Sequence, residues 1–348
     1  MKKTIKNILR LLLILSALVG VYLLFMTFTD YKPEEVIILE KTIDQSKTIA
    51  TELSVTTFNI GYASLDESTD FFMDGGTESR AKSELQVHLN LEGISNIMDD
   101  ISSDIYLLQE VDLKAKRSYK INQVDYLLEK HSTYEGIFAT NYKVPFVPVP
   151  LYKPHGQVHS GLLTLSEFKT TSNTRYQFPG EEAWPRQLAL LDRCFIESRY
   201  QYGDKELVIV NLHMSAYDSG GFMRQGQSKY LSDYLQKEYD QGNYIIVGGD
   251  FNQEIPGTNA DDFNTVDKPS WLQPMREPFD NYTWHCDPNV PTNRALDQAY
   301  VEGTSYICNI DGFLVSDNIT VEEVIVHDLK FKNSDHNPVT IKCTLKNP

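Results

Sequence analysis

The sequence predicts an α/β fold that follows a hydrophobic N-terminal segment. From residue 53 onwards, short apolar runs rich in β-branched residues recur along the chain, which is typical of buried strands. Segments with apolar residues at helical spacing lie between them, the clearest at residues 83–98 and 223–239. This alternation of strand-like and helical segments, without an internal repeat, indicates an α/β domain.

The elements can be placed in chain order from these patterns. Residues 142–158 contain four prolines, so we expect a loop there rather than a helix or a central strand. Residues 253–295 are rich in Pro, Asn and Asp and are expected to be irregular. The expected strands are residues 53–60, 105–108, 160–166, 187–196, 207–212, 244–247, 307–316 and 337–345, and the expected helices are residues 83–98, 122–130 and 223–239.

The N-terminal segment has the composition of a membrane-spanning helix. Residues 2–10 contain four basic residues, and residues 11–28 are 18 positions without a charge. This length is close to the ~20 residues that span a bilayer and exceeds the apolar core of a usual signal peptide. We therefore expect residues 1–30 to be an uncleaved signal anchor, with the basic end inside the cytoplasm and the body outside. A cleaved signal peptide, followed by secretion, is the alternative.

Beyond the anchor, residues 31–50 are expected to be a polar spacer and residues 51–348 the folded domain. If the domain lies outside the cytoplasm, its cysteines could form disulfides, and three pairings are possible. The four cysteines are Cys194, Cys286, Cys308 and Cys343, and their spacing matches no zinc site.

The charge of the domain limits its partners. The chain of 348 residues carries a formal net charge of −16; residues 1–30 carry four basic residues and one acid, or +3, so residues 31–348 carry −19. Such a body disfavours avid, sequence-independent binding of DNA, which requires many Lys and Arg contacts to phosphates. A bound divalent cation could reverse the sign of the charge at one site, so phosphate chemistry is compatible with the acidic body.

One stretch carries most of the chemical information. Residues 244–252 (YIIVGGDFN) form a short apolar run that ends in two glycines, an acid and an amide. The side chains of Asp250 and Asn252 are one strand period apart and would point the same way. A carboxylate beside an amide suits a hard cation and a phosphate oxygen. A strand followed by an ordinary Asx turn is the alternative, since Asp, Asn and Gly also favour turns for local reasons.

The same arrangement recurs elsewhere in the domain, and this favours a functional site. Polar residues lie at or beside the ends of several apolar runs, and such residues are commonly gathered on loops at one edge of a sheet. Taken singly, each has an ordinary structural explanation; taken together, they supply carboxylates, amides and two histidines. The candidates are Asn59, Glu110, Asn211, His213, Asp250, Asn252, Asp311, Asp335 and His336.

Six segments resemble, in order, the motifs of the endonuclease/exonuclease/phosphatase superfamily. They are TTFNIGY, LLQEVD, VNLHMSAY, IIVGGDFN, IDGFLVS and NSDHNPV, and they lie between residues 55 and 340. The superfamily includes DNase I-like nucleases, inositol-polyphosphate phosphatases and bacterial sphingomyelinases. The resemblance implies a four-layer αββα sandwich, in which two mixed sheets pack face to face with helices outside. It also implies metal-dependent cleavage of phosphoester bonds.

The resemblance assigns roles to the metal and phosphate ligands. Glu110 is similar to the Mg²⁺-binding glutamate, with Asn59 beside it, and Asp335 is similar to the acid before the last histidine. Mg²⁺ prefers oxygen ligands and usually takes only one or two carboxylates, so Glu110 alone or with Asp335 would suffice. The amides of Asn59, Asn211 and Asn252 can donate hydrogen bonds to the charge that develops in the transition state.

The remaining candidates resemble the catalytic groups. Asp250 and Asn252 are similar to the pair that handles the attacking water and the phosphate. His336 resembles the histidine that acts as base or phosphate ligand, and Asp311 the acid that orients it. His213 is similar to a second histidine found in the nuclease and sphingomyelinase branches, a candidate general acid.

We therefore expect a Mg²⁺-dependent phosphoester hydrolase, with Mn²⁺ as a possible substitute, that acts outside the cytoplasm and is held to the membrane by its N-terminal helix. The acidic body and the anchor favour a lipid head group or a small phosphoester as substrate. An extracellular DNase-like endonuclease that binds nucleic acid is the alternative, and a binding module without catalysis is a weaker one. The sequence indicates no protein partner.

Overall fold

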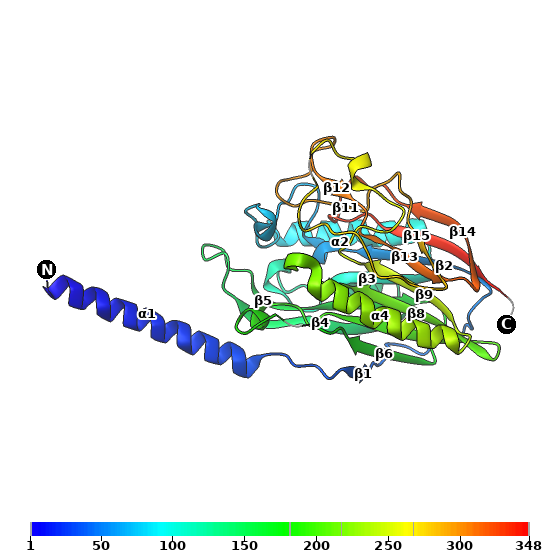
Figure 1. Cartoon of the computed structure of the whole chain (residues 1–348), viewed down its shortest axis with the longest axis horizontal. Helices are drawn as coiled ribbons and strands as arrows, with labels where there is room; N and C mark the ends of the chain where they lie inside the picture. The colour runs from blue at the N-terminus through cyan, green and yellow to red at the C-terminus, as the bar shows by residue number, and fades with distance from the viewer. Residues whose placement is uncertain (1, 181, 217, 267, 347–348) are drawn as a thin grey trace.

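In the computed structural model, residues 2–180, 182–216, 218–266 and 268–346 are described, and they form two mixed β-sheets packed face to face (Figure 1). One sheet has six strands in the order β14 (Ile319–Val326), β15 (Val339–Leu345), β2 (Glu52–Asn59), β3 (Ile105–Asp112), β5 (Gly156–Ser166) and β4 (Glu135–Val147). The other has seven strands in the order β1 (Val36–Ile38), β6 (Ser172–Gln177), β7 (Cys194–Tyr202), β8 (Lys205–His213), β9 (Tyr244–Asp250), β13 (Asp311–Ser316) and β10 (Tyr282–His285). A small ribbon pairs β11 (Asn293–Arg294) with β12 (Ile307–Cys308).

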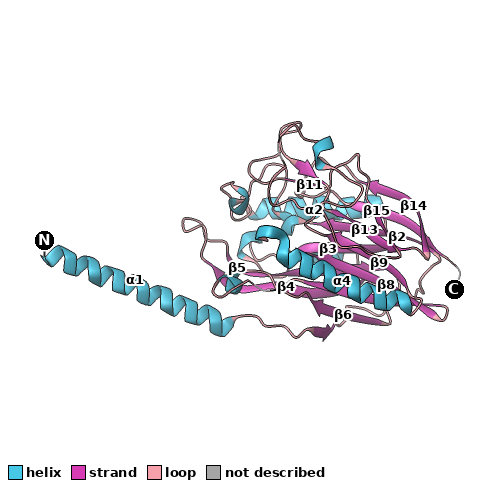
Figure 2. Ribbon diagram, in the orientation of Figure 1, coloured by secondary structure: helices cyan, strands magenta, loops and turns pink. Residues whose placement is uncertain are grey.

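Helices cover the outer face of each sheet, which gives the expected four layers (Figure 2). Helices α2 (Glu84–Ile101) and α3 (Gln123–Lys130) cover the six-stranded sheet, and α4 (Phe222–Asp240) covers the seven-stranded one. The start of α2 follows from the sequence, because the Ser83 side chain caps the helix by accepting a hydrogen bond from the backbone N–H of Gln86. The four-layer sandwich predicted from the resemblance is therefore confirmed.

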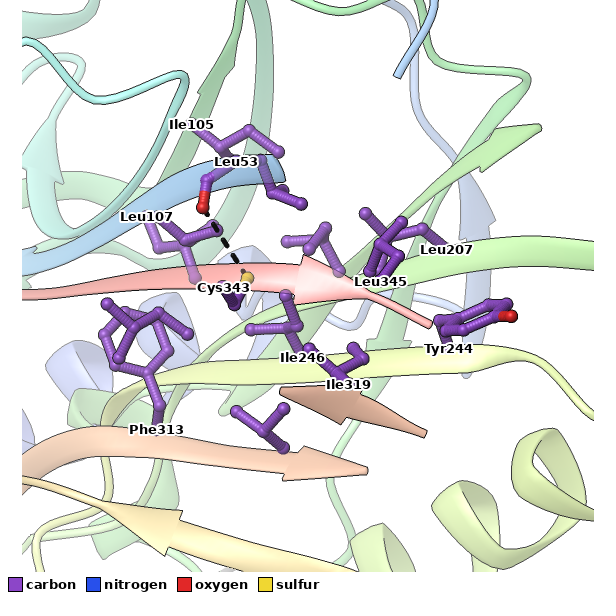
Figure 3. Packing of buried hydrophobic residues seen from close by; sticks show 14 of the residues in the cluster. Leu53, Ile105, Leu107, Leu207, Tyr244, Ile246, Phe313, Ile319, Cys343 and Leu345 are labelled. Atoms are coloured by element: carbon purple, nitrogen blue, oxygen red, sulfur yellow. Dashed lines mark hydrogen bonds between the residues drawn. The ribbon is translucent and has the colours of Figure 1, made fainter. Parts of the chain in front are cut away.

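The main core lies between the two sheets. Leu53, Ile105 and Leu107 of the six-stranded sheet pack against side chains such as Ile246 and Phe313 of the seven-stranded one (Figure 3). All five side chains are buried. Because both sheets present apolar side chains to this layer, their relative position is fixed, and so are the strand ends that surround it.

Several expected element bounds were wrong. β4 continues to Val147 through Pro145, inside the segment expected to be a loop. This is tolerated because β4 is an edge strand and its register with β5 is irregular between Val144 and Val147. The strand expected to begin at residue 187 begins instead at Cys194, after a short 3₁₀ turn. Sequence patterns locate strands better than they locate strand ends.

The segment after the anchor is partly built into the domain. Within the expected spacer, β1 (Val36–Ile38) pairs with β6 and forms one edge of the seven-stranded sheet, and the backbone N–H of Thr42 donates to the carbonyl of Gly136. The N-terminal helix α1 (Lys2–Thr29), which is long and apolar enough to span a membrane, is thus joined to the sheet by only a short length of chain. All four cysteines are free in the structure.

Glycines in β9 permit the close approach of neighbouring backbone and side chains. A Cβ atom on Gly249 would lie 2.1 Å from the carbonyl oxygen of Leu212 on the paired strand β8. A Cβ atom on Gly248 would lie 2.6 Å from Phe313 and 2.7 Å from Leu107, which belong to different sheets. The two glycines recognised in the sequence therefore serve packing just before the strand ends at Asp250.

Replacing Gly249 with alanine should lower the free energy of unfolding by about 3 kcal/mol, because the clash is with backbone that cannot move aside. Gly226 is the matched control: it is an exposed glycine of α4, and nothing lies within 4 Å of the place that a methyl group would take there. Gly226→Ala should raise stability by about 0.5–1 kcal/mol, because glycine is unfavourable inside a helix. Urea unfolding of the two variants measures both changes, and equal effects would contradict the packing argument.

Candidate active site

The candidate residues meet at one end of the sandwich because of strand register. Asp250 ends β9, where it is the register partner of His213 on β8 and of Asp311 on β13. β15 pairs with β2, and this pairing brings the loop that carries His336 to the end of β2, beside Asn59. Residues separated by up to 277 positions therefore lie within hydrogen-bonding distance of one another.

His336 and Asp311 form a buried pair. His336 Nδ1 lies 2.8 Å from Asp311 Oδ2, so Asp311 holds the ring and fixes which nitrogen faces the site. The other ring nitrogen, Nε2, lies 3.8 Å from Asp250 Oδ2 and 3.8 Å from Asp335 Oδ2. This nitrogen is the one available to a substrate.

Asp250 is the centre of the polar cluster. Asn59 Nδ2 donates to its Oδ2 at 3.0 Å, and the backbone N–H of Asn252 donates to its Oδ1 at 2.8 Å. His213 Nε2 lies 3.4 Å from Oδ2. Asn252 adopts a left-handed backbone conformation with φ of 50°, which lets its backbone N–H point back toward the Asp250 carboxylate. The side chain of Asn252 donates to the carbonyl of Met214 instead of facing Asp250.

Glu110 reaches the site through a distortion of β3. The register of β3 and β5 shifts between Leu108 and Val111, and Glu110 has φ of 57°, in the left-handed region. Such a bulge changes the direction of a side chain, and here it leaves Glu110 24% exposed among buried residues. Glu110 Oε1 lies 3.4 Å from Asn59 Nδ2 and 3.9 Å from His213 Nε2.

Burial and mutual repulsion raise the pKa values of two carboxyl groups in the cluster. Burial raises the pKa of Asp250 to about 7, and the negative charge of Asp311 adds to the rise. Burial also raises the pKa of Asp335 to about 6, where His336 opposes the rise and Glu110 increases it. Both groups therefore have a pKa closer to neutrality than an ordinary aspartate, as suits groups that exchange protons or receive a cation.

The pKa values of the two histidines are shifted in opposite directions. Burial lowers the pKa of His213 well below its usual range, with Arg193 and His336 adding to the fall. Burial would also lower the pKa of His336, but Asp311, Asp335 and Asp250 outweigh it and raise it to about 10. His213 is thus neutral at pH 7.

Two amide side chains beside His336 bear on the protonation state of its ring. The amide nitrogens of Asn293 and Asn59 lie 3.0 Å and 3.4 Å from Nε2, an arrangement that suits an unprotonated Nε2 accepting hydrogen bonds. The surrounding acids favour the protonated ring instead. Neutralising those acids would lower the pKa of His336 and leave the ring as an acceptor.

Asn211 is the candidate that the structure does not bring to the site. Its side chain is fully buried between the sheets, one strand period before His213. It accepts from Gln109 Nε2 at 2.9 Å and donates to the carbonyls of Leu108 and Leu163. With these partners the Asn211 amide connects the two sheets and is not directed at a bound phosphate.

Asn293 is a site residue that the sequence did not indicate. Besides its contact with His336, it forms an isolated bridge with that residue and donates to the carbonyl of Asp335 at 3.4 Å. It lies in the segment expected to be irregular, and no apolar run precedes it to mark a strand end. Only the tertiary structure places it.

The endonuclease/exonuclease/phosphatase family model matches residues 57–336, which is most of the chain and spans the whole cluster. The chain belongs to this family. It is therefore a hydrolase of phosphoester bonds, with two packed mixed sheets as the family fold. No curated protein matches the sequence.

Solved structures share the fold at low identity. An endonuclease/exonuclease/phosphatase from Beutenbergia cavernae is similar with a TM-score of 0.60 and 18% identity, over 85% of this chain and 72% of that one. The human Nocturnin catalytic domain with bound sulfate gives 0.52 and 18%, over 88% and 97%. ANGEL2, a 2',3'-cyclic phosphatase, gives 0.55 and 14%, over 90% and 100%.

The donor set of this family member suits a divalent cation. In the part of the chain that the structure describes, the cationic partners within 4.0 Å of Glu110, Asp250, Asp311 and Asp335 are histidines alone. Ligand atoms of Asp250, Asp311 and His336 lie within 4.8 Å of one another and could hold an ion. His336 Nδ1 is already bound to Asp311, however, and a protonated ring cannot be a ligand. Glu110, which faces the cavity, and the neighbouring Asp335 therefore fit a hard cation better.

The cluster lines a cavity of about 1270 Å³. Its members in the cavity wall include Glu110, His213, Asp250, Asp335 and His336. Much of the remaining wall is aromatic or aliphatic and includes Tyr31, Phe71, Phe72, Tyr142, Val147, Val149, Leu190, Leu191 and Trp271. The cavity thus joins a charged reaction centre to a mostly apolar binding space, as is usual for small-molecule sites.

Asn59 and Asn211 should respond differently to truncation. Asn211→Ala leaves Gln109 and buried carbonyls unpaired, so it should lower the free energy of unfolding by about 2–3 kcal/mol while the folded fraction keeps its activity. Asn59→Ala removes a donor at the reaction centre and should lower kcat by roughly 10²-fold. Urea unfolding and steady-state kinetics on the same preparations measure both. A lower kcat in the folded Asn211→Ala variant would show that this amide does act at the reaction centre.

Proposed function

We propose that this family member is a Mg²⁺-dependent phosphoester hydrolase whose catalytic domain lies outside the cytoplasm, tethered by helix α1. The observation that carries the proposal is the convergence of the His336–Asp311 pair, Asp250 and Glu110 beside the cavity. A phosphoester is anionic and repels hydroxide, so its cleavage needs a cation, a proton acceptor and a donor to the leaving group. The cluster contains candidate ligands for the cation and candidates for the proton acceptor and the proton donor.

Glu110 and Asp335 are the proposed ligands of Mg²⁺, and Mn²⁺ could substitute. Glu110 raises the pKa of Asp335, which indicates that the two negative charges are close. When bound, the cation supplies neutralisation of the phosphate oxygens and of the leaving group. Asn59 contacts both Glu110 and Asp250 and thus orients the proposed ligand relative to the proposed reaction centre.

Asp250 is proposed to handle the attacking water, and Asn252 to hold its carboxylate through the backbone N–H. The pKa of Asp250 is raised to about 7, and a general base is most effective when its pKa lies near the working pH. His336 Nε2, which lies near Asp250, can accept the proton of the water or hold a phosphate oxygen. Asp311 supports either role by fixing the ring.

His213 is proposed as the donor to the leaving oxygen. It is neutral in the free site because it is buried, and its Nδ1 has no hydrogen-bond partner among the described residues. A phosphate anion bound beside it would raise its pKa by charge attraction, so the ring would gain its proton as the substrate arrives.

An extracellular DNase-like endonuclease is the second candidate within this chemistry. The net charge of −19 on residues 31–348 and the apolar cavity wall oppose it. A lipid head group or a small phosphoester, which needs only one phosphate site, fits both observations better.

The metal assignment is tested at Glu110. We expect EDTA to abolish hydrolysis of bis(p-nitrophenyl) phosphate and added Mg²⁺ to restore it. Glu110→Gln keeps the shape of the side chain but removes its charge, so it should lower the rate by roughly 10²-fold at low Mg²⁺ and require more Mg²⁺ for half-maximal rate. The exposed Glu322 is the control, and Glu322→Gln should behave as the unaltered chain. A full rate and unchanged Mg²⁺ dependence in Glu110→Gln would show that Glu110 is not a ligand.

The histidine roles are tested with two leaving groups. His213→Ala should suffer least on an ester with an acidic leaving group such as p-nitrophenol, which departs without a proton. His336→Ala should lose about 10²–10⁴-fold on both activated and alkyl esters. The measurement is the ratio of kcat on the two esters for each variant. Equal losses of kcat on the two esters in His213→Ala would show that His213 acts as a phosphate ligand and not as a general acid.

The location is tested on intact cells. The catalytic domain should fractionate with membranes and be cut by added protease, since the only candidate membrane span in the described residues is α1. Removing residues 1–30 should give a soluble chain that still hydrolyses a soluble ester, because the cluster begins only at Asn59. A natural mature chain that starts near residue 30 would instead identify a cleaved signal peptide.

A further inference from the structure

The anchor helix packs directly on the catalytic domain. Only the last turns of α1 touch the body: Met26 is 1% exposed and lies in an apolar cluster with side chains of β4. The Tyr22 hydroxyl donates to the carbonyl of Phe146 at 3.1 Å, and Trp184 Nε1 donates to Thr27 Oγ1 at 3.2 Å. Figure 2 shows α1 projecting from this one end of the body.

This contact sets the depth of the body relative to a bilayer. The charge-free run of α1 ends at residue 28, and Tyr22 lies about 9 Å before that end along the helix axis. The body residues that touch Met26 and Tyr22 therefore lie about 3–9 Å inside the end of that run, at the edge of the hydrocarbon. Aromatic side chains such as Trp184 are typical of that level.

Exposed apolar side chains surround the same end. They belong to the end of β4, to the loop between β4 and β5 and to the segment before β7, and we call them the docking face: Phe146, Val149, Leu151, Tyr152 and Trp184. Leu151 is 85% exposed at the tip of its loop. The loop is held in place, because the Tyr152 hydroxyl donates to the carbonyl of Thr77 at 2.6 Å and Lys153 forms an ion pair with Glu78. The docking face is thus continuous with the end of the hydrophobic helix.

The catalytic cavity reaches this face. Residues 30–33 and 35, which directly follow α1, line the cavity together with Val147, Val149 and the catalytic cluster. A molecule in the bilayer surface would therefore meet the cavity beside the point where α1 leaves the membrane.

The cavity wall carries acidic and basic side chains, and its cations include Lys32, Arg186 and Arg193. Its buried arginines are engaged within the protein: Arg117 pairs with Asp112 at 2.8 Å, Arg224 donates to backbone carbonyls, and so does Arg294. A nucleic acid needs a row of cations for successive phosphates. A phospholipid presents a single phosphate and places its acyl chains against an apolar wall.

We propose that the docking face rests on the bilayer that holds α1, and that the cavity takes a phospholipid head group from that bilayer as substrate. This inference rests on the proposed phosphoester hydrolase activity. Water forms a new bond to phosphorus, the bond from phosphorus to one ester oxygen breaks, and that oxygen takes up a proton.

The test uses the full chain reconstituted with Mg²⁺ in vesicles of phosphatidylcholine, phosphatidylethanolamine, phosphatidylglycerol or sphingomyelin, with bis(p-nitrophenyl) phosphate assayed in parallel. We expect release of a phosphorylated head group or of phosphate from at least one lipid. Hydrolysis of the soluble ester without hydrolysis of any lipid would overturn the inference and leave the proposed function standing. Hydrolysis of neither substrate would overturn the proposed function itself.

A matched pair of variants tests the docking face. Leu151→Glu places a charge at the level of the bilayer and should lower the ratio of lipid to soluble-ester rate by about tenfold, on the scale of one buried leucine. Leu89→Glu makes the same change at a leucine of α2 that is 56% exposed and lies outside the docking face, and it should leave that ratio unchanged. Equal ratios in the two variants would show that the docking face does not meet the membrane.

Discussion

The pairing of β9 with its two neighbours is the constraint on which the site depends. β8 runs parallel to β9 and β13 runs antiparallel to it, and their registers place His213 and Asp311 opposite Asp250. Gly248 and Gly249 make this pairing possible, since neither position has room for a Cβ atom. A shift of one residue would turn these side chains to the other face of the sheet. The relative positions of His213, Asp250 and Asp311 are therefore set by the sheet, whereas His336 is brought to them by a loop.

The buried acids around His336 have an electrostatic effect on one another and on its ring. Asp250, Asp311 and Asp335 are each almost fully buried, and the ring of His336 is the positive group nearest to all three. Burial and the negative charge of Asp311 raise the pKa of Asp250, and the surrounding acids outweigh burial and raise the pKa of His336. The proposed divalent cation and the phosphate of the proposed substrate would together balance the charge of these acids.

The anchor and the cavity are linked by the short segment that follows α1. Residues 30–33 and 35 line the cavity, and β1 then joins the edge of the seven-stranded sheet. A flexible spacer would let the domain turn freely relative to α1, whereas this segment and the contacts of Met26 and Tyr22 join the two. If α1 spans a bilayer as proposed, this connection would turn the cavity toward that bilayer, which is the basis of the proposed lipid substrate.

The sequence by itself determined the fold class and the family, and it indicated most of the polar residues that the structure brings together. Apolar runs and the residues that follow them are local features, so Asn59, Asp250 and His336 could be recognised from the residues around them. Asn211 followed the same local pattern, yet its side chain bonds to Gln109 inside the sandwich, because strand position alone does not tell how far a residue lies from the sheet edge. Glu110 also follows an apolar run and was recognised in the same way, but the bulge that directs it into the cavity arises from a register shift with β5.

Only the tertiary structure decided the features that depend on contacts between distant segments. Asn293 carries no local signal and reaches His336 because β11 lies beside the last loop. The contact between Met26 and β4, and the edge strand β1 in the expected spacer, likewise arise from packing across more than a hundred residues of chain. Local patterns report how a residue relates to its own strand or helix. The distance between two such elements is set by how the two sheets pack, and that is a property of the whole chain.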